Sequence, residues 1–445
     1  MKTTRTIWAL LLAMAMLAAA CGDAVTGSEA DTSDSTVAST DTESDSDDTE
    51  SDSDDTVADD DDVVIEYFSF SAGEANLGRL EAIVAAFQEE NPGIRVELPT
   101  ADYESYFTAL QTRIAGGDAP DAFELNYENF VSYADAGVLM DLESAAPDVV
   151  DATAYYQGAY DAFSYDGVQY GLPGSFSVVV LFYNRDLFDA AGLDYPDETW
   201  TWDDELAAAE ALTDSAAGVW GDFQPVQFFE FYKVLAQNGG SFFNEDMTAA
   251  TFNSPEGVEA AEWLVSKVGT VTPTVEEMGG QDDGGLFMDG KIAMWHSGIW
   301  MFTAVGESDI NWDIAVEPGN VTGASHFFAN GVVGSATTEH PEAVAAWLQY
   351  LASSEVMVEQ RLEAGWELPA VADEALLAPY LELSPPDNRA AVFASLNSVV
   401  TPPVIVAQQQ MQDIVSQALE QAVLGEMTVQ EALDSAAAQV TALLP

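Results

Sequence analysis

A mostly apolar run begins abruptly at Val63. Residues 63–70 read VVIEYFSF and predict a buried strand, and apolar residues three and four positions apart then predict a helix that an Asn-Pro-Gly sequence ends. A second strand over 94–98, a helix over 103–115 and a third strand over 120–125 follow. Strands and helices in this order predict a parallel sheet covered by helices.

A similar pattern occupies the second half of the chain. It predicts a strand over 177–183 and helices over 203–212 and 228–237. Alanine-rich periodic stretches over 408–423 and 428–444 predict that the C-terminal part is mainly helical. We therefore expect an α/β protein that is long enough to build more than one hydrophobic core.

The N-terminal part has a different pattern. Two basic residues precede an apolar run from Ile7 to Ala20, which is too short to span a bilayer as a helix. The small residues before Cys21 resemble the lipobox of bacterial lipoproteins, whose cysteine becomes the lipidated first residue, for example by palmitate. We predict a signal peptide over 1–20 and lipidation of Cys21. The alternative is an ordinary signal peptide with an unmodified thiol nearby.

An acidic segment and a strongly negative charge follow from the composition. Residues 21–62 consist largely of Asp, Ser, Thr and Glu and predict a disordered linker. The whole chain has 77 acidic and 11 basic residues and a net charge of −66. This charge argues against nucleic acid and anionic membrane surfaces as partners. We expect it to destabilise the fold at low salt, as in proteins adapted to high salt.

Few residues are available for cofactor chemistry. The chain has three histidines and one cysteine, so we expect no metal site, no cofactor and no internal disulfide. No G-x-S-x-G sequence is present to indicate a hydrolase nucleophile.

Seven short motifs occur in one order along the chain. They are FQEENPGIRV at 87–96, AGGDAPD at 115–121, YNRDLF at 183–188, NGG at 238–240, FMDGKIAM at 287–294, EAVAAW at 342–347 and TVQEALD at 428–434. This order resembles the family 1 extracellular solute-binding proteins of ABC importers, which include maltose-binding proteins. The resemblance implies an α/β fold of two lobes with a ligand cleft between them, as in periplasmic binding proteins. By analogy, the first lobe comprises 63–173 and 323–370, and the second comprises 174–322 and 371–445.

The resemblance also implies a function. It predicts a monomeric, lipid-anchored protein outside the cytoplasm that captures a carbohydrate by hinge closure and delivers it to the transmembrane subunits of an ABC permease. Such a protein has no catalytic activity of its own. His296, which lies beside a tryptophan, is then a structural or ligand-edge residue.

Sugars present hydroxyl groups at their edges and apolar C–H faces, so a sugar site needs carboxylates or amides together with aromatic side chains. Glu74 and Glu128 are similar in position to sugar-binding carboxylates of maltose-binding proteins, and Trp300 matches their stacking tryptophan. Leu125 stands where those proteins have another stacking tryptophan, which weakens the case for a malto-oligosaccharide. The predicted ligand-binding residues are Glu74, Asn126, Glu128, Asn129, Ser175, Trp220, Asp222, Gln227, Phe229, Trp295, Trp300 and Asn330.

Other interpretations remain open at this point. Glu74 could be a carboxylate that favours the start of a helix, and Trp295 could be a core residue. The same fold could bind a polyamine, with Glu74 and Glu128 as counter-ions and Trp300 making a cation–π contact. A glycoside hydrolase is a further alternative, which needs two carboxyl groups about 5–9.5 Å apart.

Overall fold

The computed structural model describes residues 62–155 and 157–444, which belong to one compact unit. The predicted signal peptide over 1–20, Cys21 and the acidic linker up to residue 61 lie outside the described residues. Among the helices of the described part, none is both long enough and apolar enough to cross a membrane.

The strands that the structure describes form one large sheet and a small hairpin. They are β1 Val63–Phe68, β2 Ile94–Glu97, β3 Ala122–Asn126, β4 Ser164–Tyr165, β5 Val168–Gln169, β6 Gly171–Asn184, β7 Met294–Gly298, β8 Trp312–Ala315, β9 Ser325–Gly334 and β10 Val399–Val400. The large sheet has the order β2-β1-β3-β9-β6-β7, with β8 paired to β6 and β10 paired to β9, while β4 and β5 pair with each other.

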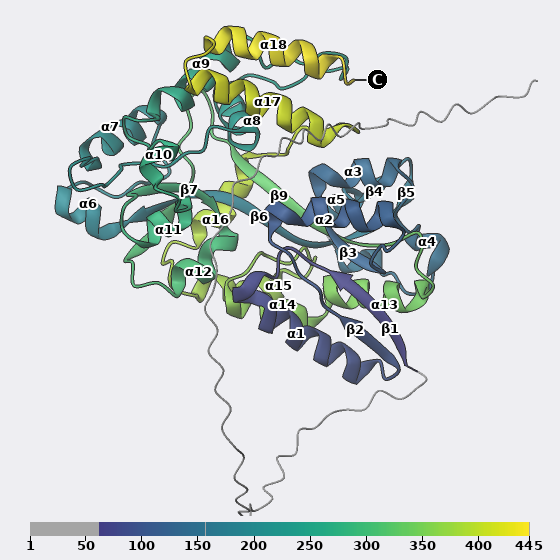
Figure 1. The fold of residues 1–445 in the computed structure, drawn as a ribbon. Coiled ribbons are helices and arrows are strands. Elements are labelled where there is room, and N and C mark those ends of the chain that lie inside the picture. Colours follow the sequence, from purple (N-terminus) through teal and green to yellow (C-terminus); the bar gives the residue numbers. More distant parts are fainter. Residues whose placement is uncertain (1–61, 156, 445) are drawn as a thin grey trace, which may run out of the picture. The chain divides into compact units, whose positions relative to one another are not determined.

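Helices surround this sheet (Figure 1). In the first part of the chain they are α1 Gly73–Glu90, α2 Tyr103–Gly116, α3 Tyr127–Asp135, α4 Leu142–Ala145, η1 Ala152–Ala154, α5 Gln157–Asp161, α6 Arg185–Ala191, α7 Trp202–Leu212, α8 Phe228–Gln237, α9 Pro255–Lys267, α10 Val275–Met278 and α11 Asp283–Met288. The later ones are η2 Ile299–Met301, α12 Phe302–Gly306, α13 Pro341–Ser353, α14 Glu355–Ala364, α15 Glu374–Leu377, η3 Ala378–Glu382, α16 Ala390–Ser395, η4 Leu396–Ser398, α17 Gln408–Val423 and α18 Val429–Thr441.

The predicted α/β class is confirmed, but the sheet is only partly parallel. β1 pairs in parallel with β2 and β3, as the strand–helix alternation predicts. β9, in contrast, runs antiparallel between β3 and β6. β9 comes from the later part of the chain and enters the sheet in the opposite direction. The alternation of strands and helices in the first part of the chain therefore could not predict its orientation.

β6 is the strand that links the two ends of the sheet. The sequence predicts a strand over 177–183, and the structure extends it to Gly171–Asn184. Its first half pairs with β9, from Gly171 to Val178, and its second half pairs with β7 and β8. All of its residues except Phe176 are buried.

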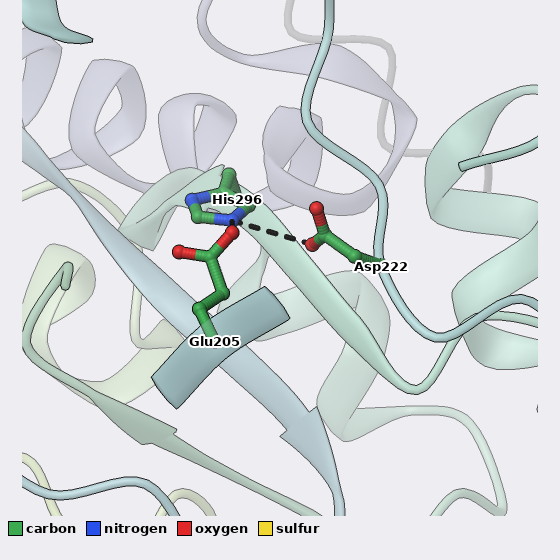
Figure 2. Close-up of side chains that lie close together, drawn as sticks. All are labelled: Glu205, Asp222 and His296. Atoms are coloured by element: carbon green, nitrogen blue, oxygen red, sulfur yellow. Dashed lines mark ion pairs between the residues drawn. The ribbon is translucent and has the colours of Figure 1, made fainter. Parts of the chain in front are cut away.

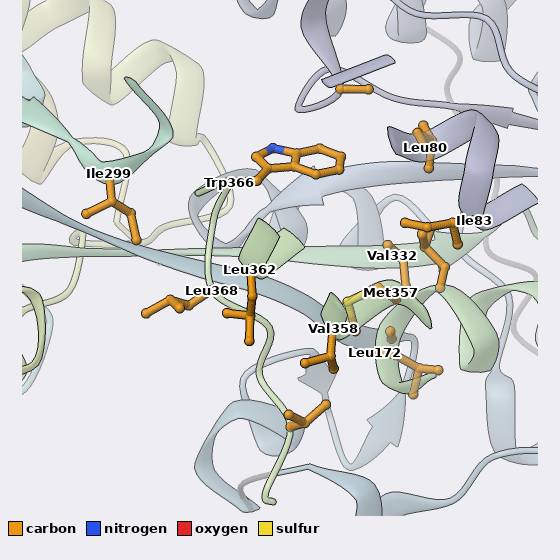
Figure 3. Close-up of a cluster of buried hydrophobic side chains, with 14 of the residues drawn as sticks. Leu80, Ile83, Leu172, Ile299, Val332, Met357, Val358, Leu362, Trp366 and Leu368 are labelled. Carbon is orange, nitrogen blue, oxygen red and sulfur yellow. The ribbon is translucent and has the colours of Figure 1, made fainter. Parts of the chain in front are cut away.

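Apolar side chains form separate clusters on different parts of the sheet. One cluster lies under α1 and α14, where Leu80, Ile83 and Met357 pack near Trp366 (Figure 3). A second cluster joins α8 and α9 to α17 and α18. A third is built around α2 and α3 on the other face of β3. These clusters fix the elements that carry the polar and aromatic residues described next.

Candidate functional site

Three polar side chains meet where β3 ends and α3 begins. Asn126 Nδ2 donates hydrogen bonds to Glu128 Oε1 at 2.6 Å and to the Tyr103 hydroxyl at 2.9 Å. Asn129 Nδ2 donates to Asn126 Oδ1 at 2.8 Å. The carboxyl end of a strand is where α/β sheets place their ligand sites. The structure therefore brings together the predicted residues Asn126, Glu128 and Asn129 at such a position.

The Glu128 carboxylate is buried. Only 1% of the residue is exposed, and Oε2 has no hydrogen-bond partner among the described residues. Burial raises the pKa of Glu128 to about 7, although hydrogen bonds from its own backbone and from Asn126 act in the opposite direction. A buried acceptor without a partner is unfavourable unless a ligand satisfies it.

A second group of side chains is aromatic. We call it the aromatic platform and define it as Trp300, Phe328 and Phe229. The Trp300 and Phe328 ring centroids are 5.7 Å apart, and those of Phe229 and Phe328 are 6.0 Å apart. The three residues come from η2, β9 and α8. Trp300 is 36% exposed, so its ring remains available for contact.

Tyr232 and His326 lie next to the aromatic platform, and neither is among the ligand-binding residues predicted from the sequence. Their ring centroids are 5.0 Å apart in an edge-on arrangement, and His326 also stacks on Phe328. His326 Nε2 lies 2.5 Å from the backbone oxygen of Phe229. Tyr232 follows Phe229 by three positions on α8, and this helical spacing was the only sequence signal that could have placed it beside Phe229. The same spacing is typical of a core residue, which is why Tyr232 was missed.

Ser175 and Asn330 lie opposite each other on β6 and β9 and share one partner. Glu367 Oε2 accepts from the Ser175 hydroxyl at 2.6 Å, and Glu367 Oε1 accepts from Asn330 Nδ2 at 2.9 Å. Arg361 Nη1 lies 3.5 Å from Glu367 Oε2. One buried carboxylate thus joins β6, β9 and the segment that follows α14. The polar atoms of Ser175 and Asn330 are engaged in this network.

Asp222 belongs to a buried ionic cluster instead of the aromatic platform. Asp222 Oδ2 lies 2.7 Å from Lys267 Nζ, and Glu205 Oε1 lies 2.8 Å from the same nitrogen. His296 Nε2 lies 3.3 Å from an oxygen of each carboxylate (Figure 2). Burial alone would raise the pKa of Asp222, but Lys267 and His296 lower it to about 2. We therefore regard Asp222 as a structural ion-pair partner.

The same cluster continues on the other side of His296. His296 Nδ1 lies 2.9 Å from Glu317 Oε1, and Lys233 forms ion pairs with Glu317 and Glu230. Burial lowers the pKa of His296, but the surrounding carboxylates raise it well above its usual range. Carboxylates and a histidine at such distances are chemically able to bind a metal ion. The lysine ammonium groups already neutralise them, so this set does not fit one.

The other predicted residues take different positions. Trp295 is 2% exposed, packs on Phe182 and Phe287, and donates from Nε1 to Asp283 Oδ2 at 2.9 Å, so it is a core residue. Trp220 is also buried and pairs through its backbone with Ile292.

Two predicted residues lie at the starts of helices. Gln227 is exposed at the N-cap of α8, two residues before Phe229. Glu74 lies in the first turn of α1, and its side chain is outside the described part of the structure.

A separate apolar cavity of about 630 Å³ lies beside the crossing strands. Phe176 and Phe327 line it and stack at 5.8 Å. Successive side chains of a strand point to opposite faces, so Phe327 and Phe328 lie on opposite faces of β9. The cavity is therefore on the face opposite to the aromatic platform.

The chain matches a protein-family model over much of its length. The model describes the bacterial extracellular solute-binding proteins, and the match covers residues 72–358. A putative binding protein of Brucella abortus is 25% identical over 376 residues, which cover 82% of this chain and 89% of that protein. The maltodextrin-binding protein of Bacillus subtilis is 26% identical over 286 residues, which cover 62% and 66% of the two chains.

A solved structure is more similar. It is an ABC substrate-binding protein from Listeria monocytogenes in complex with cycloalternan, with 46% sequence identity and a TM-score of 0.83. The match covers 86% of this chain and 99% of that chain. The likeness thus extends over nearly the whole described part, including the elements that carry the polar residues and the aromatic platform.

Proposed function

Because the chain belongs to the bacterial extracellular solute-binding protein family, we propose that it is the substrate-binding component of an ABC importer and that its ligand is a carbohydrate. The observation that carries this proposal is the combination of buried hydrogen-bonding groups at the end of β3 with the partly exposed aromatic platform. Hydroxyl groups would bind to Asn126, Glu128 and Asn129, and an apolar sugar face would pack on Trp300.

The ligand that we favour is an oligosaccharide such as cycloalternan. A protein 46% identical to this chain was solved in complex with cycloalternan, and nearly all of that protein matches this chain. An oligosaccharide also suits an aromatic platform that is built from three rings on three separate elements.

A thermal-shift screen followed by calorimetric titration tests this function. The purified protein, in high salt, is offered cycloalternan, maltodextrins, arabinooligosaccharides and a polyamine. We expect cycloalternan to raise the melting temperature and to bind at one site per chain, because a ligand at 100 times its Kd adds about 2.7 kcal/mol to the free energy of unfolding. A shift with the polyamine alone would contradict the carbohydrate proposal. Steady release of shorter sugars would indicate a hydrolase.

The lobe boundaries follow from the same proposal. We place 63–173 and 323–370 in one lobe and 174–322 and 371–445 in the other. The cluster around α2 and α3 draws its buried residues only from the first set, and the cluster around α8 and α17 draws its residues only from the second. Hinge closure across the crossing segments would bring the polar residues and the aromatic platform onto one ligand.

We also propose that Cys21 carries a lipid and anchors a monomeric protein outside the cytoplasm. Support comes from the lipobox-like sequence before Cys21 and from membership of a family of extracellular proteins. Mass spectrometry of the mature N-terminus should find an acylated Cys21. A mature chain that begins elsewhere, or an unmodified thiol, would disprove the anchor and leave the binding function intact.

A further inference from the structure

Tyr103 is an exposed aromatic residue beside the carboxyl end of β3, and the ligand-binding residues predicted from the sequence do not include it. It is the first residue of α2, and its hydroxyl oxygen accepts a hydrogen bond from Asn126 Nδ2 at 2.9 Å. Asn126 also donates to Glu128 Oε1 at 2.6 Å and accepts from Asn129 Nδ2 at 2.8 Å. Tyr103 is therefore bonded directly to the polar residues of the candidate site.

Other aromatic side chains hold the ring of Tyr103 in place. Its centroid lies 5.3 Å from that of Phe70 and 5.5 Å from that of Phe107, and both contacts are edge-on. Phe70 follows β1, and Phe107 lies one turn further along α2. The side chain is thus held at its ring by two neighbours and at its hydroxyl by Asn126. A ring that is fixed before the ligand arrives loses little conformational entropy on binding.

The surface of this fixed side chain remains accessible. Tyr103 is 44% exposed, which exceeds the 36% of Trp300 in the aromatic platform. Single exposed aromatic residues are common on protein surfaces and need no explanation by themselves. What distinguishes Tyr103 is its hydrogen bond to a residue that also bonds Glu128, a buried carboxylate whose Oε2 has no partner among the described residues. An aromatic surface and an unsatisfied acceptor thus belong to one connected group.

We propose that Tyr103 is a ligand-contacting, specificity-determining residue, and that its ring packs against the apolar face of the sugar unit whose hydroxyl groups bind Asn126 and Glu128. A sugar unit needs hydrogen-bonding groups at its edge and an apolar surface at its face, and this group of residues supplies both. Leu125, the neighbouring residue on β3, is fully buried and offers no such surface. This inference rests on the proposed function, since it adds a contact to the same site.

The arrangement also selects the length of the ligand. Among the described residues, no hydrogen bond or ring contact joins the aromatic platform to Asn126, Glu128 or Asn129, whereas Tyr103 is bonded to this group. Tyr103 would therefore serve the sugar unit at the polar residues, and Trp300 would serve a second unit. The two residues lie on α2 and η2, which belong to different proposed lobes. The site thus favours an oligosaccharide over a monosaccharide.

Calorimetric titration of three variants with cycloalternan tests the role of Tyr103. Tyr103→Ala removes the ring, and we expect it to raise the Kd about 5- to 50-fold, because a stacking face and its buried area are lost. Tyr103→Phe keeps the ring and should restore most of the affinity. Tyr195→Ala is the matched control and should bind as the wild type does. Tyr195 is 38% exposed, its hydroxyl donates to Asp189 Oδ1 at 2.8 Å, and its ring lies 5.2 Å from that of Tyr183.

A double variant tests whether two sugar units are bound. Tyr103→Ala combined with Trp300→Ala should raise the Kd by the product of the two single effects, because residues that contact different units act independently. A double variant that loses clearly less than this product would overturn the assignment of Tyr103 and Trp300 to separate units.

The failure of this inference differs from the failure of the proposed function. A wild-type Kd in Tyr103→Ala, or an equal loss of affinity in Tyr103→Phe and Tyr103→Ala, would overturn the stacking role of Tyr103 while the carbohydrate function stands. Failure of the wild-type protein to bind any of the carbohydrates would instead overturn the proposed function and this inference with it.

Discussion

Buried carboxylates in this protein differ in pKa because their partners differ. Glu128 has only amide and backbone partners, so burial dominates and raises its pKa to about 7. Asp222 is as deeply buried, yet Lys267 and His296 lower its pKa to about 2. Burial penalises the charge of both carboxylates, and a neighbouring cation decides the outcome. Glu128 is therefore suited to receive a ligand, whereas Asp222 is suited to hold the fold together.

The aromatic platform gives a direct prediction for Trp300. Trp300→Ala should weaken carbohydrate binding by about 1 kcal/mol or more, roughly a fivefold rise in Kd, because a stacking face and its buried area are lost. Calorimetric titration measures the Kd. Trp300→Phe, which keeps an aromatic face, should retain most of the affinity. An unchanged Kd in Trp300→Ala would remove Trp300 from the site.

His296 should make the stability of the protein depend on pH. Its pKa in the folded protein is raised well above the usual 6.5, because Glu317, Glu205 and Asp222 outweigh the effect of burial. The folded state then binds more protons than the unfolded state above pH 6.5. The free energy of unfolding should be greatest below that pH and fall as pH rises towards the folded pKa.

Denaturant titrations at several pH values measure this effect, with His296→Gln as the comparison. The variant should be less stable than the wild type near pH 6.5, and its free energy of unfolding should fall less steeply between pH 6.5 and 9. Parallel pH profiles for the two proteins would show that His296 does not stabilise the fold as an imidazolium.

At the scale of elements, local pattern predicted the strands and helices whose partners are close in sequence. β1, β2 and β3 have apolar runs bounded by turns, and the motif order fixed the family fold. β9 was missed because its sequence SHFFANGVVG contains Asn330 and Gly331, which weaken a strand pattern. It becomes a strand because β3 and β6 hydrogen-bond to it on both sides. Such pairing depends on distant residues and leaves no local signal.

The sequence indicated some residues of the candidate site and not others. Residues at strand ends and family positions, such as Glu128 and Trp300, were selected from the sequence, and their ligand-binding roles stay predictions. Trp295 was misplaced because β7 alternates its side chains between two faces, and the sequence does not say which face is the core.

The ionic cluster joins α7, α9 and β7, so it should contribute to their packing. Lys267→Met removes the cation between Glu205 and Asp222 and should destabilise the protein by about 3–5 kcal/mol, because two buried carboxylates lose their main partner. Urea unfolding measures the change. Lys291→Met is the control, since Lys291 and Asp289 form an exposed pair worth about 0–1 kcal/mol. Equal effects in the two variants would contradict a special role for the buried pair.

At the scale of the whole molecule, the charge of −66 is the dominant property. Repulsion between exposed carboxylates opposes the compact state, and salt shortens its range from about 10 Å at 0.1 M to about 3 Å at 1 M. We therefore propose that the protein is adapted to high salt.

Thermal melts at increasing sodium chloride concentration test this adaptation. The melting temperature should rise by several degrees between 0.1 M and 1 M salt and continue to rise above that. Sucrose at matched osmolality is the control, because it stabilises proteins by exclusion without screening charge. A melting temperature that does not change with salt would contradict the proposal.

β6 has a consequence for how the protein unfolds. The first half of this 14-residue strand pairs with β9, its second half lies between β7 and β8, and nearly all of it is buried. Neither half of the sheet can release β6 without exposing the backbone hydrogen bonds of the other half. The two lobes should therefore unfold as a single cooperative unit, with equal calorimetric and van't Hoff enthalpies, and no proteolytic fragment should survive as a folded half.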